Sequence, residues 1–561
     1  MNDARVPPAP LEKIALSCSG GGYRAASFHL GTMSYLDRMH YQGKPLLENI
    51  RMLSTVSGGT ITGIVYTLQR QQNKTFPEIY AFLMDRLRTL DLVKLGIEKL
   101  NPGVLWHNKN KRKNLINAFA ELYDEHFTGG ATFAELAEMH CHLEAVAFNS
   151  TEFNNAVDFR FRNRGTGYFG NFYLRASPAQ AAEVRLSDAM AASSCFPGGF
   201  EPILWPDDFR HADAPILNAL DQPPVGIMDG GIYDNQGIDT ILRYKGDAED
   251  SYFDCIIISD VSSPNMNPFV PAPKKPKRGI NNITLGQAWQ RGKNSNRLID
   301  WLTPITCILL CLLPFAWHYT NTIPTGICLT TAVIGTALWV IKLVLLRKLL
   351  RLPGRFKRWL LEKNPHIEFY VQKLSALDLG AVSLHRARPL LLDRLNSVLT
   401  LLFSVFLKVV RRLNYNLVYT DERWDYRRIA NLIHKLTPGD YAGPRSGERT
   451  KIVEQQSMFT GDYDHDIGPD IGAVAQTAAS FGTTLWFTPQ DQLAGTLDKL
   501  VATGQFTMCY NLIEYLENLV YGEDNGFSQL PAEKQAALRD LLERCKTDWH
   551  RFKMDPFFMQ R

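Results

Sequence analysis

Two long apolar segments near the middle of the chain limit what the rest of it can fold into. Residues 302–319 and 323–341 contain no Asp, Glu, Lys or Arg and lie almost back to back. Each approaches the length of about 20 residues that a helix needs to cross a bilayer core. The flanks are basic, with Lys and Arg gathered between 274 and 297 and again between 347 and 358. Because basic flanks stay on the cytoplasmic side, the pattern predicts a two-helix transmembrane hairpin with both ends in the cytoplasm.

A buried hairpin in a large soluble core is the alternative, because Pro304, Pro314 and Pro324 interrupt the two segments. Membrane helices tolerate proline better than soluble helices do, so we favour the membrane hairpin. A third apolar run, residues 395–407, is too short to span a bilayer and predicts an interfacial or a core helix. The basic, proline-rich stretch 271–279 predicts a surface loop that either contacts anionic headgroups or is a solvated linker, and the nearby hairpin favours lipid contact.

Charge and cysteine content exclude several other classes of protein. Lys+Arg 61 against Asp+Glu 57 gives a net charge of +4, which is too small for a nucleic-acid binder that works through bulk charge. The 9 cysteines include no CxxC pair and no metal-ligand spacing, so we expect reduced thiols in a cytosol-facing protein and no metal site. The first residues contain no apolar stretch of the kind found in signal peptides.

A glycine-rich turn lies near the start of the chain. An apolar run of strand length, residues 13–17, leads into SGGGYR at residues 19–24 and then into a helix-like stretch, residues 27–40. A turn between a strand and a helix presents free backbone N–H groups to an anion. No Lys-Ser/Thr pair follows the glycines, which excludes a Walker A phosphate loop.

A serine and an aspartate occupy two further turns. Ser57 stands between a strand-like run, residues 50–56, and an apolar stretch, residues 61–69, and is followed by two glycines. This layout is typical of a nucleophile elbow, although a plain Ser/Gly-rich loop is the alternative. Asp229 likewise precedes two glycines. A nucleophilic serine needs a base, and no histidine stands in a triad setting. We expect His29 to be a core or surface residue of its helix, so Asp229 becomes the candidate base.

These blocks, in this order, resemble the patatin-like phospholipases, which are related to the cytosolic phospholipases of the A type. Residues 19–24 match the glycine-rich motif, residues 53–59 the nucleophile block, and residues 229–231 the Asp-Gly-Gly block. Residues 191–200 and 256–260 resemble the segments on either side of the aspartate block. The resemblance covers residues 11–262 and returns near residues 481–505, where a strand-like run closes the domain.

Two positions depart from the family pattern. Thr55 stands where the elbow has its first glycine, and Ala25 stands where the glycine-rich motif has its last. Both substitutes are small, so we interpret them as variants of an active enzyme.

The resemblance implies an α/β fold, a three-layer α/β/α domain with a mostly parallel sheet, which the transmembrane hairpin interrupts. It implies a Ser57–Asp229 dyad in which Asp229 is the only base. The backbone N–H groups of Gly20, Gly21 and Gly22 then hold the oxyanion. Arg24 binds a substrate phosphate or supports the oxyanion loop. This chemistry needs no cofactor and no metal.

The expected domain organisation follows from these motifs and from the hairpin. We expect a flexible N-terminus at 1–10, the catalytic domain at 11–297, the hairpin at 298–350, a cytoplasmic insertion of unknown role at 351–440, the closing part of the catalytic domain at 441–528, and a C-terminal helix at 529–561. The C-terminal helix either packs on the core or mediates self-association into a homo-oligomer.

The expected function is that of a membrane-anchored lipid acyl hydrolase, a phospholipase A or lysophospholipase. Its substrate is bilayer phospholipid in the cytoplasmic leaflet, and no nucleic acid takes part. Two other functions remain open at this stage. One is a regulated effector that damages its host's membrane by the same chemistry, and the other is a catalytically silent membrane scaffold with a lipase fold.

Overall fold

The chain divides into two compact units. The computed structural model describes residues 9–109, 111–163, 169–244, 253–262, short pieces between 269 and 375, 381–438, 467–522 and 526–560. The larger unit comprises Met1–Met266 with Leu402–Arg561, and the smaller comprises Asn267–Leu401. The predicted hairpin at 298–350 and the basic stretch from residue 272 lie outside the described residues. Within the described ranges, no helix has the length and apolar character needed to span a bilayer.

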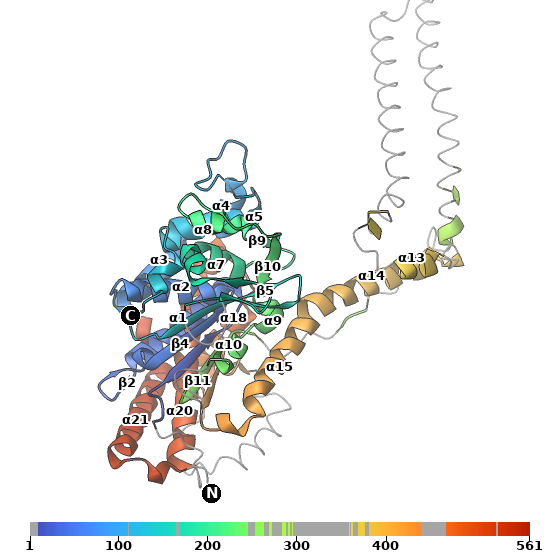
Figure 1. Ribbon diagram of the computed structural model, residues 1–561. Coiled ribbons are helices and arrows are strands. Elements are labelled where there is room, and N and C mark those ends of the chain that lie inside the picture. Colours follow the sequence, from blue (N-terminus) through green and yellow to red (C-terminus); the bar gives the residue numbers. More distant parts are fainter. Residues whose placement is uncertain are drawn as a thin grey trace, which may run out of the picture. The chain divides into compact units, whose positions relative to one another are not determined.

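A twisted sheet with ten strands among the described residues forms the middle layer of the larger unit (Figure 1). Its main order is β12-β11-β1-β4-β5-β6-β7-β8, with β10 and β9 added beside β5. The strands from β12 to β5 run parallel, and those beyond β5 are antiparallel. The bounds are β1 Ile14–Cys18, β4 Ile50–Val56, β5 Ala145–Glu152, β6 Val157–Arg162, β7 Phe169–Gly170, β8 Arg175–Ala176, β9 Ile203–Trp205, β10 Val225–Asp229, β11 Cys255–Asp260 and β12 Arg428–Leu432.

Helices cover both faces of this sheet, and a small hairpin, β2 His40–Tyr41 with β3 Lys44–Pro45, lies apart from it. The helices of the larger unit are α1 Gly22–Arg38, α2 Gly58–Gln71, α3 Phe76–Thr89, α4 Leu92–Lys99, α5 Leu115–Tyr123, α6 Pro178–Glu183, α7 Leu186–Ser193, α8 Pro215–Asn218, α9 Gly231–Asp234, α10 Ile238–Leu242, α15 Phe406–Tyr419, α18 Pro469–Ser480, α19 Pro489–Leu493, α20 Thr496–Tyr521 and α21 Ala532–Met554. The smaller unit contains α13 Glu368–Ser375 and α14 Leu384–Thr400.

Alternate residues of the central strands build two separate cores, because successive side chains of a strand point to opposite faces. In β11, Cys255 and Ile257 pack in the large core, which includes residues of α1, α2 and α20. Ile256 and Ile258 pack in a second core with residues of α10 and α15. Strands of a parallel sheet that is covered on both faces have nearly continuous apolar sequences. This explains the apolar, strand-like segments of the sequence. The predicted three-layer α/β/α fold with a mostly parallel sheet is therefore present.

The chain rejoins this domain earlier than we predicted. Strand β12 pairs in parallel with β11, and α15 packs on α9 and α10. Residues from 402 onward thus belong to the larger unit, which includes the second half of the expected insertion at 351–440. The run 395–407 is helical, and among the described residues Leu395 and Phe406 are each 54% exposed and lie outside both cores.

The C-terminal helix α21 packs on the core of the larger unit. Its apolar residues Leu538, Leu541, Leu542 and Cys545 are buried, and Figure 1 shows it beside α20, with which it is in contact. These side chains are therefore used for packing, which favours the first of the two roles expected for this helix.

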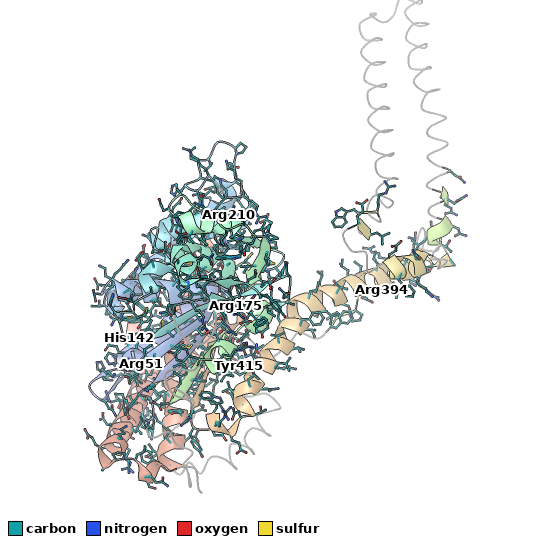
Figure 2. All side chains as sticks on the ribbon, in the orientation of Figure 1. Arg51, His142, Arg175, Arg210, Arg394 and Tyr415 are labelled. Atoms are coloured by element: carbon teal, nitrogen blue, oxygen red, sulfur yellow. The ribbon has the colours of Figure 1, made fainter. Side chains whose placement is uncertain are left out.

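A buried ion pair ties α15 to the end of β11. Arg411 Nε donates to Asp260 Oδ2 at 2.8 Å, and the hydroxyl of Tyr415 donates to the same oxygen at 3.0 Å. Figure 2 labels Tyr415 on α15. Burial by itself raises the pKa of Asp260, but the charge of Arg411 and hydrogen bonds from Ser262 and Gln236 outweigh it and lower this pKa to about 2. Asp260 is therefore a carboxylate throughout the physiological pH range, and its charge depends on Arg411.

Replacing Arg411 with methionine should leave the Asp260 carboxylate buried without its ion-pair partner. We expect the free energy of unfolding of the larger unit to fall by about 3 kcal/mol or more, as in other buried pairs that lose one member. Arg412→Met is the matched control, because Arg412 is exposed on the same helix. Urea unfolding followed by tryptophan fluorescence measures both variants. An equal loss in the two would contradict this role of the ion pair.

Candidate active site

The sheet topology brings Ser57 and Asp229 together. Strand β4 runs parallel to β5 and ends with Val56 opposite Asn149. Strand β10 pairs with β5 in the antiparallel direction and ends with Asp229 opposite Ser150. Because β6 occupies the other edge of β5, β4 and β10 approach the same edge from opposite directions. Their ends meet at neighbouring positions of β5, so the residue that follows β4 faces the last residue of β10.

Ser57 lies in a strained turn between β4 and α2. Its backbone has φ 51 and ψ −121, a conformation that residues other than glycine rarely adopt. Close backbone packing holds the turn: a Cβ added at Gly58 would lie 2.0 Å from the Gly22 carbonyl oxygen, and one added at Gly59 would lie 2.6 Å from the Cys18 oxygen. The Ser57 turn thus has the strained strand-to-helix geometry that a nucleophile elbow requires, and it packs against the glycine-rich turn.

Asp229 is buried beside this serine. Its Oδ1 accepts a hydrogen bond from the Gly231 N–H at 2.7 Å. Position 231 has no room for a larger residue, because a Cβ added there would lie 2.6 Å from Asn235 Oδ1. Burial raises the pKa of Asp229 to about 6, while hydrogen bonds from the Ser57 side chain and the Gly231 N–H act in the opposite direction. A carboxylate with this pKa is ionised at neutral pH and is basic enough to accept a proton from a serine hydroxyl in a reaction.

A chain of hydroxyl groups supports the elbow from behind. Ser193, the last residue of α7, accepts the Ser57 N–H at 2.9 Å and donates to the Asn149 carbonyl oxygen at 2.7 Å. Because its one proton is committed to Asn149, it accepts from the Thr60 hydroxyl at 2.8 Å, and Thr60 in turn accepts from Thr55 at 2.9 Å. We did not predict this role of Ser193. The resemblance of residues 191–200 to a family segment pointed to this part of the chain, but it did not indicate which side chain would contact the elbow.

The hydroxyl of Thr55 thus takes part in this chain, which accounts for one departure from the family pattern. Its methyl group is accommodated by Gly63 on α2, where an added Cβ would lie 2.6 Å from Thr55 Cγ2. The missing glycine of the elbow is therefore matched by a glycine one and a half turns into the following helix.

The glycine-rich turn divides its N–H groups between two uses. The Gly20 N–H donates to the Asn235 carbonyl oxygen at 3.0 Å, so it is not available to an oxyanion. Gly21 and Gly22 have φ 149 and φ 60, and within the described residues their N–H groups meet no acceptor. Of the three predicted donors, Gly21 and Gly22 remain candidates. Gly20 serves the close packing instead, because its added Cβ would lie 2.5 Å from Asn235 Oδ1 and 3.0 Å from Ser57 Cβ.

Arg24 fastens this turn to a distant part of the chain. Its Nη1 donates to the Phe481 carbonyl oxygen at 2.8 Å and its Nη2 to Thr483 Oγ1 at 3.4 Å. The Tyr23 N–H donates to the Thr484 oxygen at 2.7 Å. Of its two predicted roles, these contacts favour support of the oxyanion loop. The segment around residue 481 is irregular, not the predicted strand, because its carbonyl groups bond to the turn instead of to a neighbouring strand.

His29 is a structural residue, as the sequence indicated. Its Nδ1 lies 2.7 Å from Ser259 Oγ and its Nε2 lies 2.9 Å from the Ser19 carbonyl oxygen. Burial lowers its pKa to about 4, so the ring is neutral and both nitrogens are engaged. Among the described side chains, no group of three or more His, Cys, Asp or Glu is placed to hold a metal ion.

Comparison with known proteins gives one family match. The family model described as patatin-like phospholipase matches residues 16–242, a range that includes Ser57, Asp229 and the glycine-rich turn. A comparison with curated protein sequences gave no match.

Solved structures similar to this chain include human GIVD cytosolic phospholipase A2, with a TM-score of 0.31 and 12% identity over 46% of this chain and 44% of that one. The same human protein in complex with methyl gamma-linolenyl fluorophosphonate inhibitor and terbium chloride has a TM-score of 0.28 and 12% identity, over 46% of this chain and 42% of that one. The alignment thus spans less than half of each human chain. The family match therefore carries the comparison: residues 16–242 of this chain are similar to the patatin-like phospholipase family.

Proposed function

We propose that this protein is a membrane-anchored serine hydrolase that cleaves the carboxylic esters of phospholipids or lysophospholipids. The observation that carries the proposal is the meeting of β4 and β10 on one edge of β5, which brings the Ser57 side chain next to the buried Asp229 carboxylate, whose pKa it lowers. The family match supports lipid as the substrate class.

In the first half of the reaction, Asp229 takes the proton of Ser57 as Oγ attacks the ester carbonyl carbon. The N–H groups of Gly21 and Gly22 hold the oxyanion of the tetrahedral intermediate, where each such donor is worth about 2.7–4 kcal/mol. The intermediate collapses when the C–O bond to the alcohol breaks. The departing alcohol receives the proton from Asp229, and the acyl group stays on Ser57.

In the second half, Asp229 deprotonates a water molecule that attacks the acyl-enzyme. Collapse of the second tetrahedral intermediate breaks the bond to Ser57 Oγ, which recovers its proton from Asp229, and the fatty acid leaves. The same carboxylate acts as base and acid in both halves, so no histidine is required. This chemistry uses no cofactor.

Membrane anchoring remains a prediction from the sequence. It rests on the two uncharged segments within residues 298–350 and on their basic flanks, which place the catalytic domain on the cytoplasmic side. An anchored enzyme meets its lipid substrate without having to bind the surface anew for each turnover.

Substitution of either dyad member should abolish fatty-acid release from phospholipid vesicles by the detergent-purified protein. We expect Ser57→Ala and Asp229→Asn each to lower kcat by about 10,000-fold or more, since residues that act as a unit are lost together. Asp234→Asn is the matched control: Asp234 is also buried, with a pKa also raised by burial to about 6, but it accepts from Gln236 and Asp239. If the wild type hydrolyses no phospholipid, lysophospholipid or simple ester, the hydrolase proposal is refuted and the result favours the alternative of a catalytically silent scaffold.

The pH dependence should report Asp229. Because the reaction needs the carboxylate and the pKa of Asp229 is raised to about 6, kcat/KM should be constant at neutral pH. Below pH 6 it should fall about tenfold per pH unit as the base becomes protonated. A soluble chromogenic ester, which avoids changes in the lipid surface, gives this profile. A rate that rises as the pH falls from 7 to 5 would contradict Asp229 as the base.

Loss of the Ser193 hydroxyl should slow the reaction, although Ser193 itself is proposed to contact the elbow and not the substrate. Ser193→Ala leaves the Ser57 N–H and the Thr60 hydroxyl without their acceptor, which destabilises the elbow by about 1–3 kcal/mol. If the elbow shifts and this free energy is lost from the transition state, kcat should fall by roughly 5- to 150-fold. KM should change little. Ser194→Ala is the matched control, because its buried hydroxyl donates to the Met190 oxygen and not to the elbow. Equal kcat values for the two variants would exclude a positioning role for Ser193.

A further inference from the structure

Four buried polar side chains form a row across the central strands of the sheet, one each on β11, β1, β4 and β5, which are neighbours in that order. Ser17 lies opposite Ser54 in the parallel register. Asp260 and Asn149 stand two residues beyond the partners of these serines in β11 and β5, and residues two apart in a strand share a face. The exposed fraction of each of the four is 4% or less. We call them the polar row.

The polar row holds one short segment of the chain, residues 236–240, which links α9 to α10 and which we call the α9–α10 joint. Ser17 Oγ donates to the Gln236 carbonyl oxygen, and Ser54 Oγ donates to the Gly237 carbonyl oxygen at 2.7 Å. Gly237 has φ 74, and a Cβ added there would lie 2.7 Å from Ser54 Oγ. The backbone of the joint therefore lies directly on the sheet. Because the joint begins seven residues after Asp229, the row anchors the segment that follows the Asp-Gly-Gly turn.

Asn149 uses its whole side chain to connect this joint with the strand that leads to the elbow. Its Nδ2 donates to the Thr55 carbonyl oxygen at 2.9 Å and to Ser54 Oγ at 3.0 Å. Its Oδ1 accepts from Thr240 Oγ1 at 2.7 Å. The Thr55 carbonyl oxygen can only accept, which fixes the amide nitrogen on the side of β4. An ionised carboxylate at this position could not make either donor bond, so the site requires an amide.

The main chain of Asn149 contacts both turns of the candidate dyad. Its carbonyl oxygen accepts from Ser193 Oγ at 2.7 Å, and Ser193 in turn accepts the Ser57 N–H. The same oxygen lies against the residue that follows Asp229, since a Cβ added at Gly230 would lie 2.4 Å from it. One residue of β5 thus touches the support of the serine and the turn of the aspartate.

We propose that Asn149 is a positioning residue that sets the distance between Ser57 and Asp229, because its amide joins the elbow strand to the α9–α10 joint. The inference rests on the proposed function, since it assigns a role in that reaction. Asn149 is 4% exposed and acts through its neighbours, not on the substrate. Loss of its amide should therefore lower kcat and leave KM nearly unchanged.

The first test compares the same substitution at two buried asparagines of the full-length protein in detergent. Asn149→Asp removes both donor bonds of the amide. Asn431→Asp is the matched control: Asn431 on β12 is also buried, donates to Thr32 Oγ1 at 2.8 Å and accepts from Asn511 Nδ2 at 3.0 Å, but β11 and β1 separate its strand from β4. On a soluble chromogenic ester we expect Asn149→Asp to lower kcat about tenfold or more, the effect of leaving buried polar groups unpaired. Asn431→Asp should keep kcat near the wild-type value.

A milder pair of variants separates positioning from a general loss of folded protein. Thr240→Val leaves Asn149 Oδ1 without its donor and adds no charge, and Thr240→Ser restores the hydroxyl. We expect Thr240→Val to lower kcat about fivefold or more and Thr240→Ser to recover most of the loss. If Asn149→Asp protein does not fold, this pair decides the question.

The pH profile of Thr240→Val gives a second readout. The Ser57 side chain lowers the pKa of Asp229, so a more distant Ser57 lets this pKa rise, and the acid limb of kcat/KM moves to higher pH. Tyr123 and Cys195 also interact with Asp229, but burial raises the pKa of both groups, which keeps them neutral in this range. A smaller amount of folded protein would lower the rate at every pH without moving the limb.

Hydrogen exchange measures the joining of the two turns without catalysis. In Asn149→Asp protein, exchange should become about tenfold faster or more both in the peptide that contains residues 57–60 and in the one that contains residues 236–240. Asn431→Asp should accelerate exchange in neither peptide.

An unchanged kcat in Asn149→Asp protein would overturn the proposal, as would a slower Thr240→Val enzyme whose acid limb stays in place. Faster exchange in only one of the two peptides would also overturn it, even in an active enzyme, and the hydrolase proposal would then stand alone. If the wild type hydrolyses no ester but both peptides exchange faster together in Asn149→Asp protein, the joining by Asn149 stands and the hydrolase proposal falls.

Discussion

The architecture of the site depends on backbone packing against backbone without side chains between. An added Cβ at Gly58 would lie 2.0 Å from the Gly22 oxygen, and one at Gly22 would lie 2.2 Å from the Thr484 oxygen. Farther along α1, an added Cβ at Gly31 would lie 2.0 Å from the Val501 oxygen, and one at Gly504 would lie 2.1 Å from the Phe28 oxygen. Helix α1 is thus pressed between the elbow and α20, which gives the strained conformation of Ser57 the rigid surroundings that such a turn requires.

The second support of the site comes from residues far along the chain. Arg411 holds Asp260, and Asp260 accepts from Gln236 and from the Ser262 N–H. The Ser262 hydroxyl accepts from Asn235, whose carbonyl oxygen binds the Gly20 N–H. A continuous set of hydrogen bonds therefore runs from α15 to the glycine-rich turn. The part of the chain that follows the predicted hairpin is therefore integral to the larger unit, since it completes the polar network on which the glycine-rich turn rests.

Sequence reasoning found what is encoded locally. The elbow and the Asp-Gly-Gly turn need small residues at fixed spacings around Ser57 and Asp229, so the sequence indicated both turns, while the three-layer fold was implied by the family resemblance. Strand β12, with sequence RIANL, was missed because Arg428 and Asn431 interrupt its apolar pattern and only its pairing with β11 makes it a strand. Ser193 was missed because its partners Ser57 and Thr60 lie more than 130 residues away. Such contacts follow from tertiary packing, not from the local pattern.

Helix α15 also reaches the turn that contains Asp229. Asn414 Nδ2 donates to the Tyr233 carbonyl oxygen of α9, and α9 begins two residues after Asp229. Arg411 of the same helix holds Asp260 at the end of β11. Because a close-packed interior transmits small displacements, a shift of α15 would be felt both at the Asp229 turn and at the glycine-rich turn. Helix α15 therefore supports both halves of the candidate site.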